Sequence, residues 1–399
     1  GAIVNYADNI AETFVRAARA NASKTAIIEA KDSSSITFRG LNDRSDAYVE
    51  HFISQGVTSG EVVILMVKPS IDFICLTLAL FKLGTPVVLI DPGMGFKNLL
   101  RCIKRVEPDY LIGIPKALLF SKLFPKPFVS IKKRFCCGTS FGLFGRNIST
   151  VRGVSEKTHE VYKPLENDLA AIIFTTGSTG PPKGVRYEHS IFSAQLKLIE
   201  SYYEIGGKDV DQPAFPLFAL FSTALGACAV IPDMDPTQPA KVDPAKFVSS
   251  LIKYKVTYSF GSPAIWRVVS NYCVAEGIKL PSLEKVLMAG APVPYDLLGK
   301  MVEILPREGR VMTPYGATES LPIASIDNNE ILSETMDLSR VGKGTCVGRS
   351  LPGIEIKIIE LSDDVIDSIE NCNFLDRYCV GEIIVRGGVV TRAYMNNDE

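Results

Sequence analysis

Short apolar runs alternate with amphipathic stretches along most of the chain, and this alternation constrains the fold more than any other feature. Strand-like runs at residues 61–67, 85–91 and 110–114 alternate with segments of helical periodicity at residues 41–52 and 70–83. Neighbouring parallel strands need a crossover connection, which is usually a helix, so this order favours a parallel sheet with helices on its faces. We therefore expect an α/β fold.

The second half of the chain repeats the alternation and then changes character. Strand-like runs are predicted at residues 169–174, 256–260, 285–288 and 310–313. From about residue 340 short strands and turns replace the longer pattern, with strand-like runs at residues 354–359 and 381–386, which indicates a small β-rich lobe. The expected fold is therefore two doubly wound, mostly parallel sheets packed with helices, followed by this small lobe.

The same pattern predicts three regions. Residues 125–165 mix Pro, Lys, Gly and Ser with weak periodicity, so we interpret them as an irregular connection between two lobes. We expect a first α/β lobe over residues 1–165, a second α/β lobe over residues 166–339, and the small β-rich lobe over residues 340–399.

Composition and charge exclude several classes of function. The 399 residues are 46% hydrophobic and 22% charged, with a formal net charge of −1. This balance suits a globular protein with a sizeable core, and it creates no overall field for nucleic acid or anionic lipid. We therefore expect no nucleic-acid partner.

The lack of a targeting signal and the cysteine pattern together predict the cellular compartment. The longest uncharged apolar run, residues 73–81, is far shorter than the roughly 20 residues of a membrane-spanning helix. The start of the chain lacks a signal-peptide pattern, and the nine cysteines show neither disulfide nor zinc spacing. We expect a cytoplasmic protein with reduced thiols and no transmembrane segment.

A glycine- and hydroxyl-rich segment, TTGSTGPPKG at residues 175–184, follows a predicted buried strand. Gly177, Gly180 and Gly184 let backbone N–H groups approach an anion, and Lys183 adds a positive charge. No Gly-Lys-Ser/Thr triplet closes the segment, so it is not the loop of the P-loop NTPases. It nevertheless combines the donors and the cation that a polyphosphate needs. The side chains that supply hydroxyl donors are Thr175, Thr176, Ser178 and Thr179.

Two further motifs follow in order, AGAPV at residues 289–293 and TPYGATE at residues 313–319. The three motifs together resemble those of the acyl-adenylate-forming superfamily, which includes acyl-CoA synthetases, peptide-synthetase adenylation domains and luciferases. The resemblance covers essentially the whole chain, including residues 36–41 and 381–383. It implies ATP-dependent activation of a carboxylic acid as an acyl-adenylate, on the fold of the large N-terminal domain of these enzymes.

The resemblance also implies roles for single residues at the adenosine end of ATP. Tyr315 is expected against the adenine ring, with Gly290 and Ala291 lining its other side. Pro292, Gly316 and Ala317 belong to the same two motifs and are implied to bind the nucleotide with them.

Three residues are implied to act in the chemistry itself. Thr318 is expected to donate to the α-phosphate and Glu319 to hold Mg²⁺ between the phosphates. Lys183 and the loop hydroxyl groups are expected to bind the β- and γ-phosphates that leave as pyrophosphate. The attacked phosphorus gains negative charge, which a metal ion and hydrogen-bond donors stabilise. His189 is not a candidate base, because a carboxylate is already ionised near neutral pH.

Residues 215–226 correspond to the acyl-pocket region of the superfamily. Many relatives have a His or another polar residue where this chain has Ala219, and no Asp for binding an amino group is evident there. A fatty acid is therefore favoured over an amino acid as the substrate. The residues expected to line an apolar tunnel, for which ordinary core packing is the alternative, are Phe218, Leu220, Phe221, Phe260, Gly261 and Trp266.

A narrower resemblance, to the bacterial olefin β-lactone synthetases of the OleC type, appears at residues 230–239, 260–264, 291–294 and 344–348. It implies that a long-chain β-hydroxy acid is adenylated and that its own hydroxyl group then displaces AMP to close a β-lactone. A fatty acyl-CoA synthetase or fatty-acyl-AMP ligase is the alternative enzyme. A non-catalytic nucleotide- or acyl-binding module is the alternative of another class.

The end of the sequence departs from the pattern of the superfamily. Relatives continue beyond residue 399 with an Asp that holds the ribose hydroxyl groups, a hinge, and a mobile C-terminal domain that carries a catalytic Lys. We expect this sequence to be a truncated form that keeps nucleotide binding and has weak turnover. The expected partners are the acyl acid and ATP, with association to other olefin- or lipid-biosynthesis enzymes as a further prediction.

Overall fold

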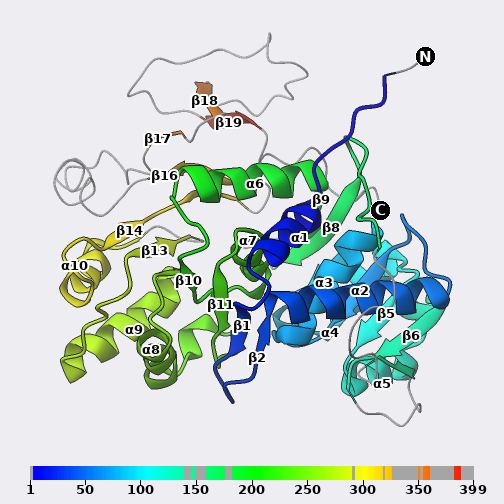
Figure 1. Cartoon of the computed structure of the whole chain (residues 1–399), viewed down its shortest axis with the longest axis horizontal. Helices are drawn as coiled ribbons and strands as arrows, with labels where there is room; N and C mark the ends of the chain where they lie inside the picture. The colour runs from blue at the N-terminus through cyan, green and yellow to red at the C-terminus, as the bar shows by residue number, and fades with distance from the viewer. Residues whose placement is uncertain are drawn as a thin grey trace.

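The computed structural model describes residues 3–138, 145–148, 159–175, 182–289, 293–317, 320–325, 349–350, 354–359 and 382–387. Two large sheets stand side by side in Figure 1, with helices packed against them. Among the described residues, no helix is both long enough and apolar enough to cross a membrane. All six cysteines in these ranges are free and buried.

The first sheet has seven strands, and six of them run parallel. Only the last two neighbours, β8 and β9, pair antiparallel, with Thr175 opposite Lys183. The order across the sheet is β7-β6-β5-β3-β4-β8-β9. The strands are β3 (Val63–Met66), β4 (Val87–Ile90), β5 (Tyr110–Gly113), β6 (Lys133–Cys136), β7 (Arg146–Asn147), β8 (Leu169–Thr175) and β9 (Lys183–Glu188).

The second sheet also has seven strands and is parallel except where β1 meets β2. Its order is β14-β13-β12-β10-β11-β1-β2. The expected architecture of two mostly parallel sheets is therefore confirmed. The strands are β1 (Thr25–Glu29), β2 (Ser35–Thr37), β10 (Val210–Asp211), β11 (Cys228–Ile231), β12 (Tyr258–Gly261), β13 (Lys285–Met288) and β14 (Arg310–Met312).

Membership of the two sheets does not follow the boundary expected at residue 165. Strand β1 pairs in parallel with β11, with Ile27 opposite Ala229, so the start of the chain belongs to the second sheet. Strands β8 and β9 lie beyond residue 165 but close the first sheet, with Ile90 of β4 opposite Phe174. The chain thus crosses between the sheets more than once.

The connection expected to be irregular at residues 125–165 also contributes strands. Strand β6 pairs in parallel with β5, and β7 pairs with β6 at the edge of the first sheet. Lys133 and Arg134 open β6 and are half-buried, while Phe135 and Cys136 are buried. Two basic residues in a strand of four hide its apolar pattern from an analysis of the sequence alone.

Helices cover the sheets and join them through a shared core. Helices α1 and α2 pack against each other, and α1 also contacts α3, α6 and α7. One continuous cluster of buried residues includes Val63 and Val87 of the first sheet with Ile27 and Ala229 of the second. The helices are α1 (Ile10–Ala20), α2 (Phe38–Ser54), α3 (Ile71–Leu83), α4 (Phe96–Val106), α5 (Pro115–Leu123), α6 (His189–Ser201), α7 (Ala219–Ala224), α8 (Pro244–Lys253), α9 (Pro263–Glu276) and α10 (Tyr295–Ile304), with short 3₁₀ turns η1 (Pro92–Met94), η2 (Lys126–Phe128), η3 (Pro216–Phe218) and η4 (Pro239–Lys241).

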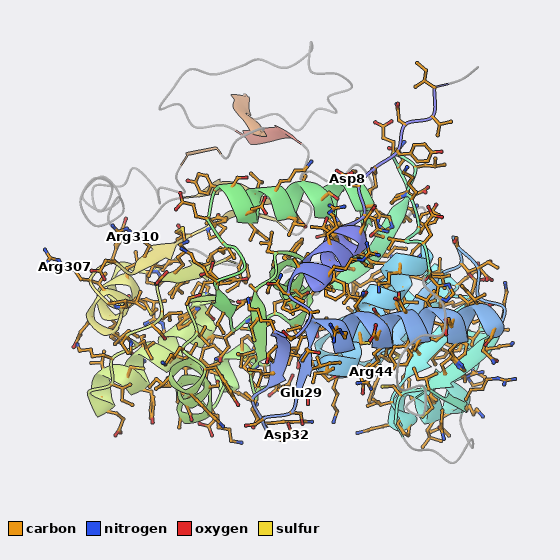
Figure 2. The ribbon with its side chains drawn as sticks, viewed as in Figure 1. Asp8, Glu29, Asp32, Arg44, Arg307 and Arg310 are labelled. Carbon is orange, nitrogen blue, oxygen red and sulfur yellow. The ribbon has the colours of Figure 1, made fainter. Side chains whose placement is uncertain are left out.

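Helix α3 shows how local sequence sets these boundaries. The Ser70 side chain accepts from the Phe73 N–H and caps the start, and Gly84 ends the helix with a left-handed φ of 79°. Between the caps the side chains are almost all buried, because the helix is covered on all sides. Asp72 in its first turn pairs with Arg44 of α2 at 2.5 Å, and Arg44 is labelled in Figure 2.

The last described segments form two small antiparallel sheets. Strands β15 (Tyr315–Ala317), β16 (Ser320–Ser325) and β17 (Arg349–Ser350) form one, and β18 (Ile354–Ile359) and β19 (Glu382–Gly387) form the other. Strands β18 and β19 match the strand-like runs expected from the sequence. A separate lobe over residues 340–399 stays a prediction.

Candidate active site

A cavity of about 350 Å³ lies between the two sheets. Its walls come from the β8–β9 hairpin of the first sheet, from α6, and from strands of the second sheet. Helix α6 runs above the sheets in Figure 1, and its residues Phe192, Gln195 and Ile199 line the cavity. Almost all of the lining is apolar, as expected of a site for a hydrocarbon chain. The lining residues used below are Ile173, Tyr187, Phe218, Phe221, Phe260, Gly261, Leu287, Ala289, Pro314, Asp211 and Tyr258.

The register of the second sheet places three strand ends together beside this cavity. Gly261 at the end of β12 lies opposite Met288 of β13, and Leu287 lies opposite Met312 of β14. The loops that leave these parallel strands therefore start from the same edge of the sheet. Ligands of open α/β sheets bind at this carboxyl edge.

The three motifs begin at positions that the structure describes, although parts of them lie outside the described residues. Thr175 is the last residue of β8 and Lys183 the first residue of β9, where its side chain is exposed. Tyr315, Gly316 and Ala317 form β15. The predicted site residues outside the described ranges are Thr176, Gly177, Ser178, Thr179, Gly180, Gly290, Ala291, Pro292, Thr318 and Glu319.

Residues at or next to the starts of these motifs line one cavity. Ile173 stands two residues before Thr175, Ala289 opens the second motif, and Pro314 directly precedes Tyr315. These residues come from different strands that lie far apart in the sequence. The fold thus gathers the starts of all three motifs around one apolar space.

Four of the six residues expected in an acyl pocket line the cavity. Phe218 and Phe260 stack with ring centroids 4.2 Å apart, and Phe218 also meets Phe221 at 5.8 Å. Gly261 lies at the end of β12, where a side chain would project toward the Trp266 ring. Aromatic side chains of this kind provide a large apolar surface with a fixed shape.

Leu220 and Trp266 do not line this cavity. Leu220 is 1% exposed and packs into the core shared by the sheets. Phe218 and Phe221 are three residues apart and therefore lie on the same face, and Leu220 points away from that face. Trp266 is fully buried and meets Phe247 edge to face at 5.6 Å. Its ring stands behind Gly261, so for these two residues core packing is what the structure shows.

A buried carboxyl group in the cavity wall escaped the sequence analysis. Asp211 of β10 is 1% exposed, and its Oδ2 is 2.5 Å from Ser222 Oγ. Burial raises the pKa of Asp211 to about 8, although the Ser222 and Tyr258 hydroxyl groups oppose the shift. No local signal in the sequence marks Asp211, because residues 208–212, KDVDQ, are mostly polar.

His189 begins α6 and is buried rather than placed in the cavity. Its ring meets the Phe81 ring edge to face at 5.4 Å. Burial lowers the pKa of His189 to about 4, so the imidazole is neutral near pH 7. These surroundings agree with a structural role.

No group of three or more His, Cys, Asp or Glu side chains that could hold a metal ion occurs within the described residues. Mg²⁺ at a nucleotide site is commonly held by one or two carboxylates together with phosphate oxygens.

Comparison with curated proteins finds relatives that cover most of the chain, and two of them are 38% identical to it. An olefin beta-lactone synthetase of Xanthomonas campestris pv. campestris is 38% identical over 369 residues, which cover 91% of this chain and 64% of that protein. A protein of the same name from Stenotrophomonas maltophilia is 38% identical over 365 residues, which cover 91% and 65%. The chain thus spans just under two thirds of the length of these relatives.

Solved structures with the same fold include a long-chain-fatty-acid-CoA ligase from Archaeoglobus fulgidus, with a TM-score of 0.79 at 20% identity over all of this chain and 79% of that one. The N-terminal domain of FACL13 from Mycobacterium tuberculosis has the same TM-score at 18% identity, covering 98% of this chain and 91% of that domain. Residues 14–395 match the model of the family described as AMP-binding enzyme. The chain therefore belongs to the AMP-binding enzyme family.

Proposed function

We propose that this chain is the large part of an ATP-dependent ligase that adenylates a long-chain β-hydroxy acid and then closes a β-lactone. The observation that carries the proposal is the apolar cavity whose wall includes Ile173, Ala289 and Pro314, beside the starts of the three nucleotide motifs. An acyl chain in this cavity would present its carboxylate to a nucleotide held by those motifs. The 38% identity to two olefin beta-lactone synthetases favours the second step.

In the first step a carboxylate oxygen attacks the α-phosphorus of ATP, and the bond to the bridging oxygen of pyrophosphate breaks. Lys183 and the loop hydroxyl groups bind the leaving phosphates, and Thr318 donates to the α-phosphate, whose charge increases in the transition state. Glu319 would hold the magnesium ion, which offsets phosphate charge when bound. The predicted contacts of Tyr315 with the adenine ring fix the other end of the nucleotide.

In the second step the β-hydroxyl oxygen attacks the acyl carbonyl carbon and AMP leaves with the bonding electron pair. The hydroxyl proton is released, so the products are the lactone and AMP. Because both groups belong to one molecule, the cavity has only to hold the hydroxyl oxygen close to the carbonyl carbon. An apolar wall with aromatic rings such as Phe218 and Phe260 restricts the acyl chain in this way and excludes water.

A fatty acyl-CoA synthetase or fatty-acyl-AMP ligase is the second candidate, because the same apolar cavity would hold an acid without a hydroxyl group. It differs in the fate of the adenylate, which a thiol would consume. A non-catalytic binding module would leave Lys183, Thr318 and Glu319 without a role, and pyrophosphate release would exclude it.

The test incubates the protein with ATP, Mg²⁺ and a long-chain β-hydroxy acid, with and without CoA. We expect pyrophosphate, AMP and β-lactone without CoA, and a stalled adenylate from the matching acid that lacks the hydroxyl group. An acyl-CoA product together with no lactone would support the second candidate. Cytoplasmic location and association with other lipid-biosynthesis enzymes are further predictions, which fractionation and co-purification from the source cells would check.

A further inference from the structure

One polar side chain faces the apolar cavity from deep within the second sheet. Asp211 lines the cavity, yet it is 1% exposed, and most of the other lining residues, such as Ile205 and Leu287, are apolar. Burying a carboxyl group among apolar side chains is costly unless its oxygen atoms have hydrogen-bond partners. The surroundings of the two oxygen atoms therefore indicate what the group can bind.

The two oxygen atoms of Asp211 differ in their partners. Oδ2 lies 2.5 Å from Ser222 Oγ, and the Tyr258 hydroxyl group also interacts with this carboxyl group. Oδ1 itself has no hydrogen-bond partner among the residues that the structure describes. Ser222 Oγ also lies 3.1 Å from the carbonyl oxygen of Phe218. A hydroxyl group has a single proton, so when Ser222 donates to Phe218, the short contact needs a proton on Oδ2. Oδ1 is then the carbonyl oxygen of a neutral acid, which accepts a hydrogen bond.

The charge state agrees with this arrangement. Burial is the main cause that raises the pKa of Asp211 to about 8, and the nearby carboxylate of Asp209 acts in the same direction. The hydroxyl groups of Ser222 and Tyr258 oppose the shift without cancelling it. A neutral group in this position suits an uncharged donor rather than an ammonium group.

The position of Asp211 along the cavity decides which part of an acid it would meet. Asp211 pairs with Tyr258 of β12, and Tyr258 stands three residues before Gly261 at the carboxyl end of that strand. With a rise of roughly 3.3 Å per residue, Asp211 lies about 10 Å behind the edge where the nucleotide motifs begin. It would therefore lie beside the hydrocarbon chain, well away from the reacting carboxylate.

We propose that Asp211 Oδ1 accepts a hydrogen bond from a hydroxyl group carried on an internal carbon of the acyl chain, remote from the carboxyl end. The inference rests on the proposed adenylation of an acyl acid and narrows the substrate to hydroxylated long chains. A plain hydrocarbon would leave Oδ1 buried without a partner, and that lost bond disfavours it. Asp211 is thus a specificity-determining residue rather than a catalytic one.

The test measures binding of tetradecanoic acid and a positional series of its monohydroxy isomers by calorimetry, without ATP. The variants are Asp211→Leu, which removes the acceptor, and Asp211→Asn, whose amide can donate to Ser222 and keeps a carbonyl oxygen at Oδ1. We expect the wild type and Asp211→Asn to prefer one internal isomer over the plain acid by about tenfold. Asp211→Leu should lose that preference and bind the plain acid at least as tightly as the wild type.

Four results would overturn the assignment: the same preference in Asp211→Leu, an equal loss of affinity for every acid, a wild-type preference for an amino-substituted chain, or no binding of any acid. Thermal unfolding of each variant checks that it is folded. If Asp211→Leu does not fold, the other two proteins decide. Equal wild-type affinities for the plain acid and every internal isomer overturn the proposal, and an isomer preference that Asp211→Asn retains supports it.

Pyrophosphate release is measured separately in the presence of ATP. Isomer-selective binding without pyrophosphate release would contradict the adenylation step and leave the Asp211 assignment standing.

Discussion

Gly184 closes the phosphate motif on strand β9, and replacing it with Ala tests how tightly the β8–β9 hairpin is packed. Gly184 lies opposite Phe174 of β8. A Cβ atom at position 184 would lie 2.6 Å from Phe174 Cζ and 2.8 Å from Cε1. Carbon atoms pack best at about 3.5–4.0 Å, so the ring would have to move by roughly 1 Å.

The Phe174 ring has no free space to move into. It is fully buried in a cluster that includes Ile64 of β3 and Val88 of β4. Forcing an extra carbon into a packed core typically costs about 1–3 kcal/mol. We predict that Gly184→Ala lowers the free energy of unfolding by that amount and weakens ATP binding, because the hairpin holds both ends of the loop at Thr175 and Lys183.

Gly299→Ala is the matched control. Gly299 is exposed in α10, and no atom lies within 4 Å of its added Cβ. Ala is favoured over Gly inside a helix by about 1 kcal/mol, so the same chemical change should stabilise the protein there. Urea unfolding measures both changes, and calorimetry measures ATP affinity. Equal stabilities of Gly184→Ala and the wild type would refute the packing argument.

Three further predictions address the cavity, the phosphates and pH. Gly261→Ala places a Cβ 2.8 Å from Nε1 of the buried Trp266, so fatty-acid affinity and stability should both fall, as followed by calorimetry and urea unfolding. Lys183→Met should reduce acid-dependent pyrophosphate release by about tenfold or more because a charge-assisted contact is lost, whereas the same change at the distant Lys279 should have no effect in that assay. The pKa of His189 is lowered to about 4 in the folded state, so only the unfolded state binds a proton between about pH 6.5 and 4. As the pH falls through that range, the free energy of unfolding of the wild type should therefore decrease by at most about 3 kcal/mol more than that of His189→Gln. Urea unfolding at a series of pH values measures both, and parallel curves for the two proteins would contradict the prediction.

Local patterns predicted most individual elements, because apolar periodicity reports directly on which faces are buried. Residues 285–288 and 354–359 are strands with the predicted bounds, and helix α3 begins one residue after the predicted start. The assignment of strands to sheets was not predictable in the same way. It depends on pairings between distant segments, such as β1 with β11, which no local pattern contains.

The candidate site was predictable where a motif marks it and obscure elsewhere. Phe218, Phe260 and Gly261 line the cavity, as their places next to recognisable segments indicated. The direction of Leu220 depends on how a short helix is rotated against the core. The role of Asp211 depends on burial and on one missing hydrogen bond, and both of these appear only in three dimensions.

Binding of a non-hydrolysable acyl-adenylate mimic, a long-chain acyl sulfamoyl adenosine, tests most directly whether one cavity joins an acyl site to an adenosine site. Calorimetry on the 399-residue chain would compare the mimic with AMP and with the free fatty acid. The account predicts that the mimic binds far more tightly than either part and that each part competes with it. A mimic that binds no more tightly than AMP, with no competition from the fatty acid, would contradict the account.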